Sequence, residues 1–587
     1  MSPIYPDDLP KEELAELFPL ERPRIRENTF EIGLVLAGTV SAGAYTAGVL
    51  DYIIEALDSW TRAKEQRSPD APKHEVVIST IAGASGGAIN GAILTRAAGW
   101  SFQHGSDRDN PFYSTWAHGV DLSDLLSTQV EPGIDGFASL FNCKAIEKKT
   151  AAAIAYQGEE LGAGASPAQR SYLANPLRLF MMVNNVTGVP YTIPMTGESK
   201  LGRDFLAHAD FMRFALAVDG GVPNCPMSRP DEIVLRSCAT ENWDRLGAAA
   251  LATSAFPFAF RARPLTRALR TAAYRVVVIP AESGAPEIKQ LIPNWERLVE
   301  DADPSVVNFV AVDGGTINNE PLDVVRTALA GLNGRNKRQG TEADRAVLMI
   351  DPFSDPDTLG PRQPPGVLNL LMPFITSLIY QARFRPEDIA LAENNDVFSR
   401  FLIAPFGFGP GKSPFSGKAA LASGGLGGFI GYVDRSFQHY DYMLGRRNAY
   451  EFLKDDFAFP ANHHLFNDGN WTDDQRSAQR ASPNGSGTEY LRMIPLMPEL
   501  TENPPPLMTA ATWPKLSELP NALAEKIAER LDAVYQLVFA ENVPLSWWKR
   551  MIISAYACLG WKLMLRGALR NAALDTIIES LRKQELL

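Results

Sequence analysis

A serine flanked by glycines is the part of the sequence whose residue types could best do chemistry. Gly83-Ala84-Ser85-Gly86-Gly87 follows the β-branched run 76–81 and precedes a stretch that predicts a helix from Ala88 to about Ala98. Small residues let the backbone turn sharply between strand and helix, which exposes the serine at a helix N-terminus where negative charge is favoured. The pattern predicts a nucleophile for acyl transfer. Taken alone, the pentapeptide fits a plain glycine-rich loop equally well.

A serine nucleophile needs a base, and two aspartates follow apolar runs that predict strands. Asp313-Gly314-Gly315 comes directly after 306–312, and Asp351 comes directly after 346–350. Two glycines allow close approach of backbone and substrate, whereas Pro352 offers no N–H group. Asp313 is therefore the favoured base and Asp351 its rival, although an aspartate that merely ends a strand would look the same.

A second glycine-containing turn, Gly38 to Gly43, lies between the apolar run 30–36 and a helix predicted from Ala44 to Leu57. Backbone N–H groups of such a turn can converge on the oxyanion of a tetrahedral intermediate, and each donor is worth roughly 3–4 kcal/mol. A structural βα turn without this role is the alternative. Gly407 to Ser413 looks like a phosphate loop but has Phe406 where the pattern needs glycine, so we do not expect nucleotide binding there.

Together these blocks resemble the patatin-like phospholipase family. Gly38 to Leu50, Gly83 to Gly87, Ala252-Thr253-Ser254-Ala255-Phe256-Pro257 and Asp313-Gly314-Gly315 occur in the order typical of that family, within residues 30–330. The resemblance implies a lipid acyl hydrolase of phospholipase A or lysophospholipase type that uses a Ser–Asp dyad and neither a cofactor nor a metal. The residues that it assigns are the catalytic Ser85 and Asp313, an oxyanion hole at Gly38, Thr39, Val40 and Gly43, and supporting glycines Gly83, Gly87, Gly314 and Gly315.

The sequence departs from the family pattern in the oxyanion turn. Thr39 and Val40 stand where members carry glycines, and Ala42 stands where they carry a basic residue. Because Thr39 and Val40 do not easily adopt φ > 0, a relative that binds lipid without turnover is a second hypothesis. A Ser–His–Asp esterase is a third, in which a loop would have to deliver His439 or His464 to the serine.

Apolar runs that alternate with helical stretches predict an α/β fold: a three-layer, mostly parallel sheet with helices on both faces, plus a helix-rich C-terminal extension. After Asp351-Pro352 the sequence becomes rich in proline and glycine. We therefore expect the chain to have three parts: an N-terminal arm over 1–28, a catalytic domain over 29–355, and a C-terminal extension or cap over 356–587. In such sheets ligands bind at the carboxyl ends of strands, where both glycine-rich turns fall.

Composition limits the function classes. The chain has 587 residues and a net charge of −12, which argues against a nucleic-acid partner. Its four cysteines are scattered, so we expect neither a disulfide framework nor a zinc site. With no signal-peptide pattern at the start, the sequence predicts a cytoplasmic protein.

The C-terminal segment 545–587 suggests contact with a membrane surface. It carries seven basic and three acidic residues, together with Trp547, Trp548 and Trp561. Lys562, Arg566 and Arg570 would form a stripe on a helix lying in the interface. The uncharged part, 551–561, is too short to span a bilayer. A helix packed on the catalytic domain is the alternative.

Overall fold

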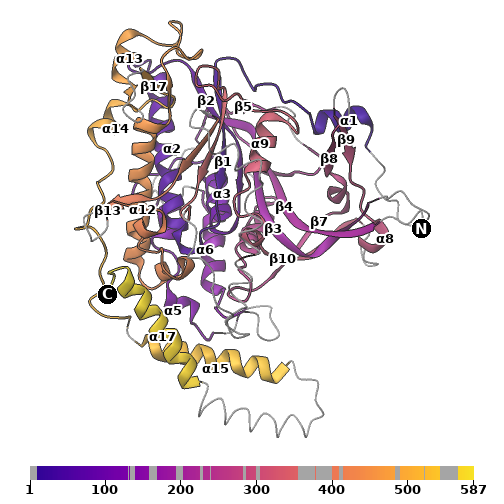
Figure 1. The fold of residues 1–587 in the computed structure, drawn as a ribbon, viewed down its shortest axis with the longest axis vertical. Helices are drawn as coiled ribbons and strands as arrows, with labels where there is room; N and C mark the ends of the chain where they lie inside the picture. The colour runs from indigo at the N-terminus through magenta and orange to yellow at the C-terminus, as the bar shows by residue number, and fades with distance from the viewer. Residues whose placement is uncertain are drawn as a thin grey trace.

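The computed structural model describes residues 9–106, 108–129, 131, 139–157, 168–193, 203–224, 229–237, 240–281, 286–298, 305–354, 377, 399–408, 414–482, 489–520, 522–541 and 566–587. A mixed, mostly parallel sheet forms the centre of the molecule (Figure 1). Its strands, in spatial order, are β12 (Arg400–Ile403), β11 (Arg345–Ile350), β1 (Thr29–Leu36), β2 (Glu75–Gly83), β3 (Leu173–Ile193), β10 (Val306–Asp313) and β7 (Arg263–Ala268).

The strands from β12 to β3 pair in parallel, whereas β10 runs antiparallel to both β3 and β7. A long hairpin partner, β4 (Arg203–Ala217), pairs with β3 and with β6 (Ile233–Arg236), and β5 (Val222–Pro223) adds to β3. Every residue of β1 is buried, as expected for a central strand covered on both faces. Buried and more exposed positions alternate along β10, so one face of this strand is less covered.

Helices cover both faces of the sheet. On one face, α9 (Leu322–Ala330) packs Val325 and Leu329 against Val35, Phe180 and Val347. The helices of the other face, which share the main core, are α2 (Gly43–Glu65), α3 (Ser85–Ala97), α4 (Pro111–Trp116), α6 (Lys144–Ala155), α7 (Trp243–Thr253) and α12 (Arg435–Glu451). The predicted fold class, a helix-flanked and mostly parallel sheet, is confirmed.

The chain beyond residue 355 packs into the same core. Strand β12 extends the central sheet beside β11, and α12 lies along α2 on the left of Figure 1. The contact is close: a Cβ added at Gly445 would lie 2.2 Å from the Tyr45 carbonyl oxygen, and one at Gly48 would lie 2.0 Å from that of Tyr442. The division at residue 355 stays a prediction.

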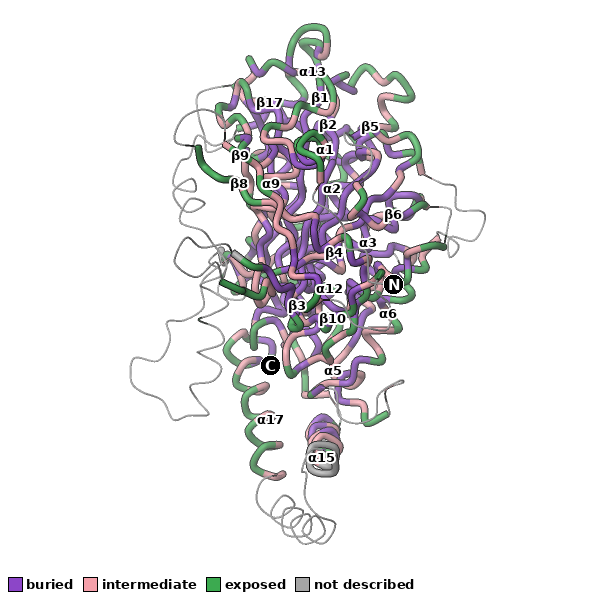
Figure 2. The backbone as a smooth tube through the Cα atoms, turned by 90° about the vertical axis from the view of Figure 1, so that its right-hand side faces the viewer, coloured by how far each residue is buried: buried purple, intermediate pink, exposed green. Residues whose placement is uncertain are grey.

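Smaller elements surround this core, in chain order α1 (Lys11–Leu17), η1 (Val40–Ala42), α5 (Leu122–Leu125), η3 (Leu269–Ala273), β8 (Val276–Ile279), β9 (Glu287–Gln290), α8 (Trp295–Leu298), η4 (Gly314–Thr316), β13 (Phe406–Phe408), β14 (Pro414–Ser416), η5 (Gly417–Ala420), η6 (Leu426–Gly428), η7 (Ile430–Tyr432), η8 (Phe452–Asp456), β15 (Ala458–Pro460), α13 (Asp473–Ala478), β16 (Arg480–Ala481), β17 (Tyr490–Arg492) and α14 (Pro498–Glu502). At the far end, α15 (Leu523–Glu541) and α17 (Arg566–Lys583) lie side by side, and much of α17 is exposed (Figure 2). The predicted interfacial residues Trp547, Trp548, Trp561 and Lys562 lie outside the described residues.

Candidate active site

Ser85 stands at a sharp turn between a strand and a helix. β2 ends at Gly83 and α3 begins at Ser85 itself, three residues earlier than the sequence predicted. The serine has φ +51, a left-handed conformation that a non-glycine residue adopts only at an energetic cost and that is typical of a nucleophile elbow. Its side chain is therefore held at the N-terminus of a helix, where the dipole and the free N–H groups stabilise negative charge.

Glycines let the elbow lie against the neighbouring strand end. A Cβ added at Gly87 would lie 2.3 Å from the Leu36 carbonyl oxygen, which real side chains do not tolerate. The backbone N–H of Ser85 donates to the Thr253 hydroxyl over 3.0 Å, so α7 also fixes the elbow. Gly83 is the last residue of β2 and precedes the turn.

Asp313 reaches Ser85 because β10 runs antiparallel to β3, whereas β2 runs parallel to it, so the ends of β10 and β2 point toward each other. Along β3, Met181 pairs with Gly83 at the end of β2, and Val183 pairs with Asp313 at the end of β10. The ends of β2 and β10 thus face each other, and their partners on β3 are two residues apart. The Ser85 hydroxyl donates to Asp313 Oδ2 over 2.8 Å, and the Gly315 backbone N–H donates to Oδ1 over 2.7 Å.

Burial gives this carboxyl group the electrostatics of a base. Asp313 is 3% exposed. Its burial raises the pKa to about 7, and the hydrogen bonds from Ser85 and Gly315 partly oppose the shift. A carboxylate with a pKa near neutrality can accept a proton from a hydroxyl more readily than an ordinary one, so the pair suits nucleophilic catalysis. Gly314 passes directly beside the Met182 carbonyl oxygen, which leaves no room for a side chain.

The turn that contains Gly38 lies beside the serine. A Cβ added at Gly38 would lie 3.2 Å from Ser85 Cβ, and the Gly38 N–H donates to the Asn319 carbonyl oxygen over a long 3.3 Å. Thr39 and Val40 follow in the same turn, and the buried Thr39 hydroxyl lies against Gly86. Gly43 lies further along, at the first turn of α2 against the Trp116 ring.

Val40 adopts the conformation that its side chain disfavours. Its φ is +48, whereas Thr39 keeps a φ of −139. A β-branched residue at positive φ costs about 1–3 kcal/mol, so its surroundings must hold it there. The neighbouring Ser41 hydroxyl donates to the Gly428 carbonyl oxygen, and Gly428 approaches the Val40 side chain. The glycine-rich stretch 423–428 thereby braces the turn, a role that the sequence did not reveal.

A small cavity of about 70 Å³ opens at Ser85. Its walls come from η1, α3, α4, α6, the segment 254–260, η7 and α12, and include Val40, Ile89, Trp116, Phe260 and Tyr432. Beside it Phe429 contacts Phe256, Phe260 and Phe141, with ring centroids 5.8–6.4 Å apart. The surroundings of Ser85 are thus mostly apolar, with Lys149 and Gln438 among the polar residues of the lining. The cavity is much smaller than the 300–1,000 Å³ of typical ligand sites, so a long chain needs its walls to move.

The other candidate bases lie in different surroundings. Asp351 accepts the Phe353 N–H over 2.9 Å in the turn after β11. His439 is hydrogen-bonded to the Tyr113 hydroxyl, and the neighbouring pair His463 and His464 to carbonyl oxygens of residues 343 and 341. The geometry therefore favours Asp313 over a histidine as the partner of Ser85.

Comparisons with known proteins agree with this architecture. The model of the patatin-like phospholipase family matches residues 34–326, which contain the elbow, the Gly38 turn and Asp313. The chain belongs to the patatin-like phospholipase family. It is also 33% identical, over 549 residues, to the uncharacterized protein y4iI of Sinorhizobium fredii (strain NBRC 101917 / NGR234), an alignment that covers 86% of this chain and 76% of that protein.

In this member of the patatin-like phospholipase family, Thr253 and Asn319 lie at the site, although the sequence indicated no role for them. Thr253 lies in the block 252–257, whose order marked the family without indicating that its hydroxyl accepts the Ser85 N–H. Asn319 contacts Gly38 and Gly315 from the loop after Asp313. Within the ranges that the structure describes, no group of three or more His, Cys, Asp or Glu side chains could hold a metal, and no helix is long and apolar enough to cross a membrane.

Proposed function

We propose that the protein hydrolyses carboxylic esters of lipids, with Ser85 as nucleophile and Asp313 as general base. The observation that carries the proposal is the 2.8 Å hydrogen bond from the Ser85 hydroxyl to a buried carboxylate with a raised pKa, at a strained elbow. The family membership and the apolar walls around Ser85 favour a lipid ester over a polar one.

The reaction follows from the contacts of the pair. Ser85 Oγ attacks the ester carbonyl carbon while its proton passes to Asp313 Oδ2. The resulting oxyanion accepts hydrogen bonds from backbone N–H groups of the turn 38–40; that of Gly38 exchanges a weak 3.3 Å bond to Asn319 for a charged acceptor. Asp313 then returns the proton to the departing alkoxide, and an acyl-enzyme remains. Water attacks it with Asp313 again as base, which releases the fatty acid and restores Ser85.

A fluorophosphonate probe, which reacts with activated serines, tests the nucleophile. We expect the wild-type protein to be labelled, Ser85→Ala to lose labelling completely, and Asp313→Asn to be labelled at least 100-fold more slowly because the base is missing. Ser254→Ala is the matched control, since this nearby serine lines the same cavity but donates to the Ala250 carbonyl oxygen.

Three outcomes separate the hypotheses. Absence of labelling in the wild-type protein would overturn the enzymatic proposal and favour a lipid-binding relative without turnover. Ester turnover that survives Asp313→Asn but disappears in His439→Ala would favour a triad esterase. Labelling of Ser85→Ala at the wild-type rate would place the nucleophile elsewhere.

We further propose that the protein meets lipid at a membrane surface close to the Ser85 cavity. Phe258 is 74% exposed and lies in the segment whose Phe256 and Phe260 line that cavity. Leu140, which is 40% exposed, is hydrogen-bonded through its N–H to the Phe258 carbonyl oxygen, so two exposed apolar side chains adjoin. Of the predicted basic stripe, Arg566 pairs with Asp532 of α15, which leaves its charge partly neutralised.

Phe258→Ser tests the membrane contact. We expect binding to phospholipid vesicles and hydrolysis of their lipids to fall about 10-fold, because burial of a phenylalanine side chain contributes about 1.5–3 kcal/mol. Turnover of a short soluble ester should be unchanged. Flotation with vesicles and release of fatty acid measure the two effects, and Val310→Ser, an exposed residue on β10, is the control. Equal losses on soluble and vesicle substrates would contradict the proposal.

A further inference from the structure

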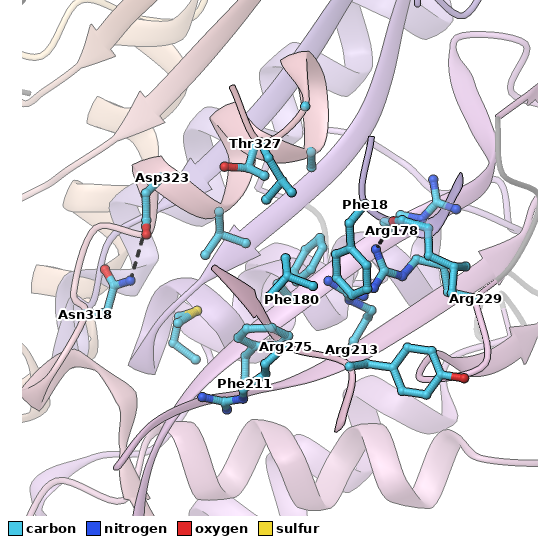
Figure 3. A pocket seen from close by; sticks show the side chains of 18 of the residues that line it. Phe18, Arg178, Phe180, Phe211, Arg213, Arg229, Arg275, Asn318, Asp323 and Thr327 are labelled. Atoms are coloured by element: carbon cyan, nitrogen blue, oxygen red, sulfur yellow. Dashed lines mark hydrogen bonds between the residues drawn. The ribbon is translucent and has the colours of Figure 1, made fainter. Parts of the chain in front are cut away.

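A second and larger cavity, of about 570 Å³, lies on the face of the sheet that α9 covers. Its floor includes Phe180 of β3 and Phe211 of β4, and Phe18 of the N-terminal arm closes one side (Figure 3). Its volume is that of a typical small-molecule site, and its lining residues differ from those around Ser85. Nothing in the proposed ester hydrolysis uses it.

Guanidinium groups dominate one side of this cavity. Five arginines line it: Arg22, Arg178, Arg213, Arg229 and Arg275. Figure 3 labels four of them: Arg178, Arg213 and Arg229 lie beside Phe18 and Phe180, and Arg275 lies beside Phe211. The guanidinium of Arg213 lies 4.7 Å from the Phe180 ring centroid, and that of Arg229 lies 4.1 Å from that of Phe18. Planar cations stacked on rings keep their edge N–H groups in a fixed orientation.

Three of these arginines, Arg213, Arg229 and Arg275, each share a carboxylate with another arginine. Asp231 pairs with both Arg213 and Arg229, at 2.6 and 3.0 Å, and Asp210 pairs with both Arg267 and Arg275. Asp231 and Asp210 therefore each face two cations. Even with Glu232 paired to Arg178, the carboxylates leave part of the positive charge uncompensated. The Nε atom of Arg213 is buried without a hydrogen-bond partner among the described residues. Burial lowers the pKa of Arg213 to about 10, although Asp231 opposes this shift. A bound anion would raise this pKa again.

The α9 side of the cavity is mainly apolar. Leu322, Val324 and Ala328 of α9 line it together with Ile317 and Leu332. Three acidic side chains also line it: Asp323 accepts from the Asn318 amide, Glu320 accepts from that of Asn319, and Glu232 pairs with Arg178 at 2.7 Å. In Figure 3, Asp323 and Asn318 lie across the view from Arg178, Arg213 and Arg229. The cavity thus presents most of its cations on the side of β3 and β4 and aliphatic side chains on the side of α9.

We propose that this cavity binds an amphipathic anion, with a carboxylate or phosphate head against Arg213, Arg229 and Arg275 and an alkyl chain along α9. Guanidinium groups form bidentate hydrogen bonds with either head group, and the aliphatic wall removes the chain from water. A long-chain carboxylate and a monoalkyl phosphate are the two sources of this chemistry.

The segment 317–320 connects this cavity with the Ser85 site. Ile317, Asn318 and Glu320 line the cavity, while the intervening Asn319 accepts the Gly38 N–H and lies against Gly315. A ligand that shifts this segment alters the hydrogen bond of a proposed oxyanion donor. We therefore expect occupancy to change ester turnover, a consequence that rests on the proposed function, whereas binding itself does not.

Isothermal titration of Ser85→Ala protein tests binding without turnover. The probes are laurate and dodecyl phosphate below their micelle concentrations, with dodecanol as the uncharged control. We expect one site per chain for at least one anion, and binding at least 10-fold weaker for dodecanol. Preference between laurate and dodecyl phosphate identifies the head group. No heat with either anion, or equal affinity for dodecanol, would overturn the proposal.

A matched pair of arginines locates the site. Arg275 and Arg267 pair with the same Asp210, but only the first lines the cavity among the described residues. We expect Arg275→Gln to weaken binding at least 10-fold and Arg267→Gln to leave it within 2-fold, with circular dichroism checking that both fold. Thr327→Phe, which fills the cavity from α9, should abolish binding. Unchanged binding in both Arg275→Gln and Thr327→Phe would place the site elsewhere and refute the proposal.

Discussion

The Ser85 hydroxyl donates to Asp313, and among the described residues no histidine lines the cavity at Ser85. A histidine base owes its usefulness to a pKa near neutrality, and burial raises the pKa of Asp313 into the same range. Each of its oxygens has a distinct partner, Ser85 for one and the Gly315 N–H for the other, so the carboxylate is oriented as well as basic. One buried aspartate can therefore perform both functions that a triad divides between histidine and aspartate.

The raised pKa of Asp313 predicts the pH dependence of turnover. The base must be ionised, so kcat/KM should rise about 10-fold per pH unit below pH 7 and level off above it. A stopped assay with a short soluble ester from pH 5 to 9 measures this. A rate that is flat across pH 7 would contradict the assignment.

The raised pKa of Asp313 also makes the free energy of unfolding depend on pH. The folded-state pKa lies above the unfolded value of about 4, so protonation of Asp313 favours the folded state. This contribution is fully present below about pH 4 and is lost as the pH rises through about 7. We expect the free energy of unfolding of the wild-type protein to contain this pH-dependent contribution between pH 4 and 8, and Asp313→Asn to lack it. Urea unfolding at several pH values in this range measures both proteins.

At the scale of elements, the crossing of α2 and α12 joins the chain after residue 355 to the face of the sheet that carries Ser85. Gly48 of α2 and Gly445 of α12 each pass close to the backbone of the other helix. The same pair is joined by Arg446, which pairs with Asp51 and Glu55 of α2. Since α2 begins directly after the turn 38–42, this contact also holds that turn, the proposed oxyanion hole, in place.

Gly445→Ala should therefore destabilise the protein. Its Cβ would meet the Tyr45 carbonyl oxygen at 2.2 Å, and overpacking of this kind costs about 1–3 kcal/mol. Urea unfolding measures the loss. The matched control is Gly567→Ala in helix α17, where a Cβ meets open space, so we expect no loss and a gain of up to about 1 kcal/mol from helix propensity. Equal stability of Gly445→Ala and the wild-type protein would mean that the helices can separate locally.

At the scale of the whole molecule, the sheet and its outer helices form a shared core. The cluster of buried residues that includes Leu34 and Ile81 continues through Tyr52 of α2 to Tyr440 and Phe457 beyond residue 400. A predicted boundary near 355 would cut through this cluster. Gly428, in the glycine-rich stretch 423–428, also packs against the Val40 side chain next to Ser85.

A chain ended at residue 355 tests the predicted domain division. It lacks β12 and α12, so the edge of β11 and the outer face of α2 become exposed, and we expect it to aggregate. The soluble fraction and size-exclusion chromatography measure this against the full chain. A soluble monomer with native-like circular dichroism would instead support an independent domain over 29–355.

The sequence alone indicated the fold class, the family and the pair Ser85 and Asp313, because these depend on local patterns: β-branched runs, glycines at sharp turns and the order of four short blocks. The tertiary structure alone decided how the pair meets, since the antiparallel direction of β10 has no local signature. It also decided what holds Val40 at positive φ, which helix covers α2, and that arginines from distant strands and the N-terminal arm share one cavity. Such features depend on contacts between segments hundreds of residues apart, and packing of the whole core determines them.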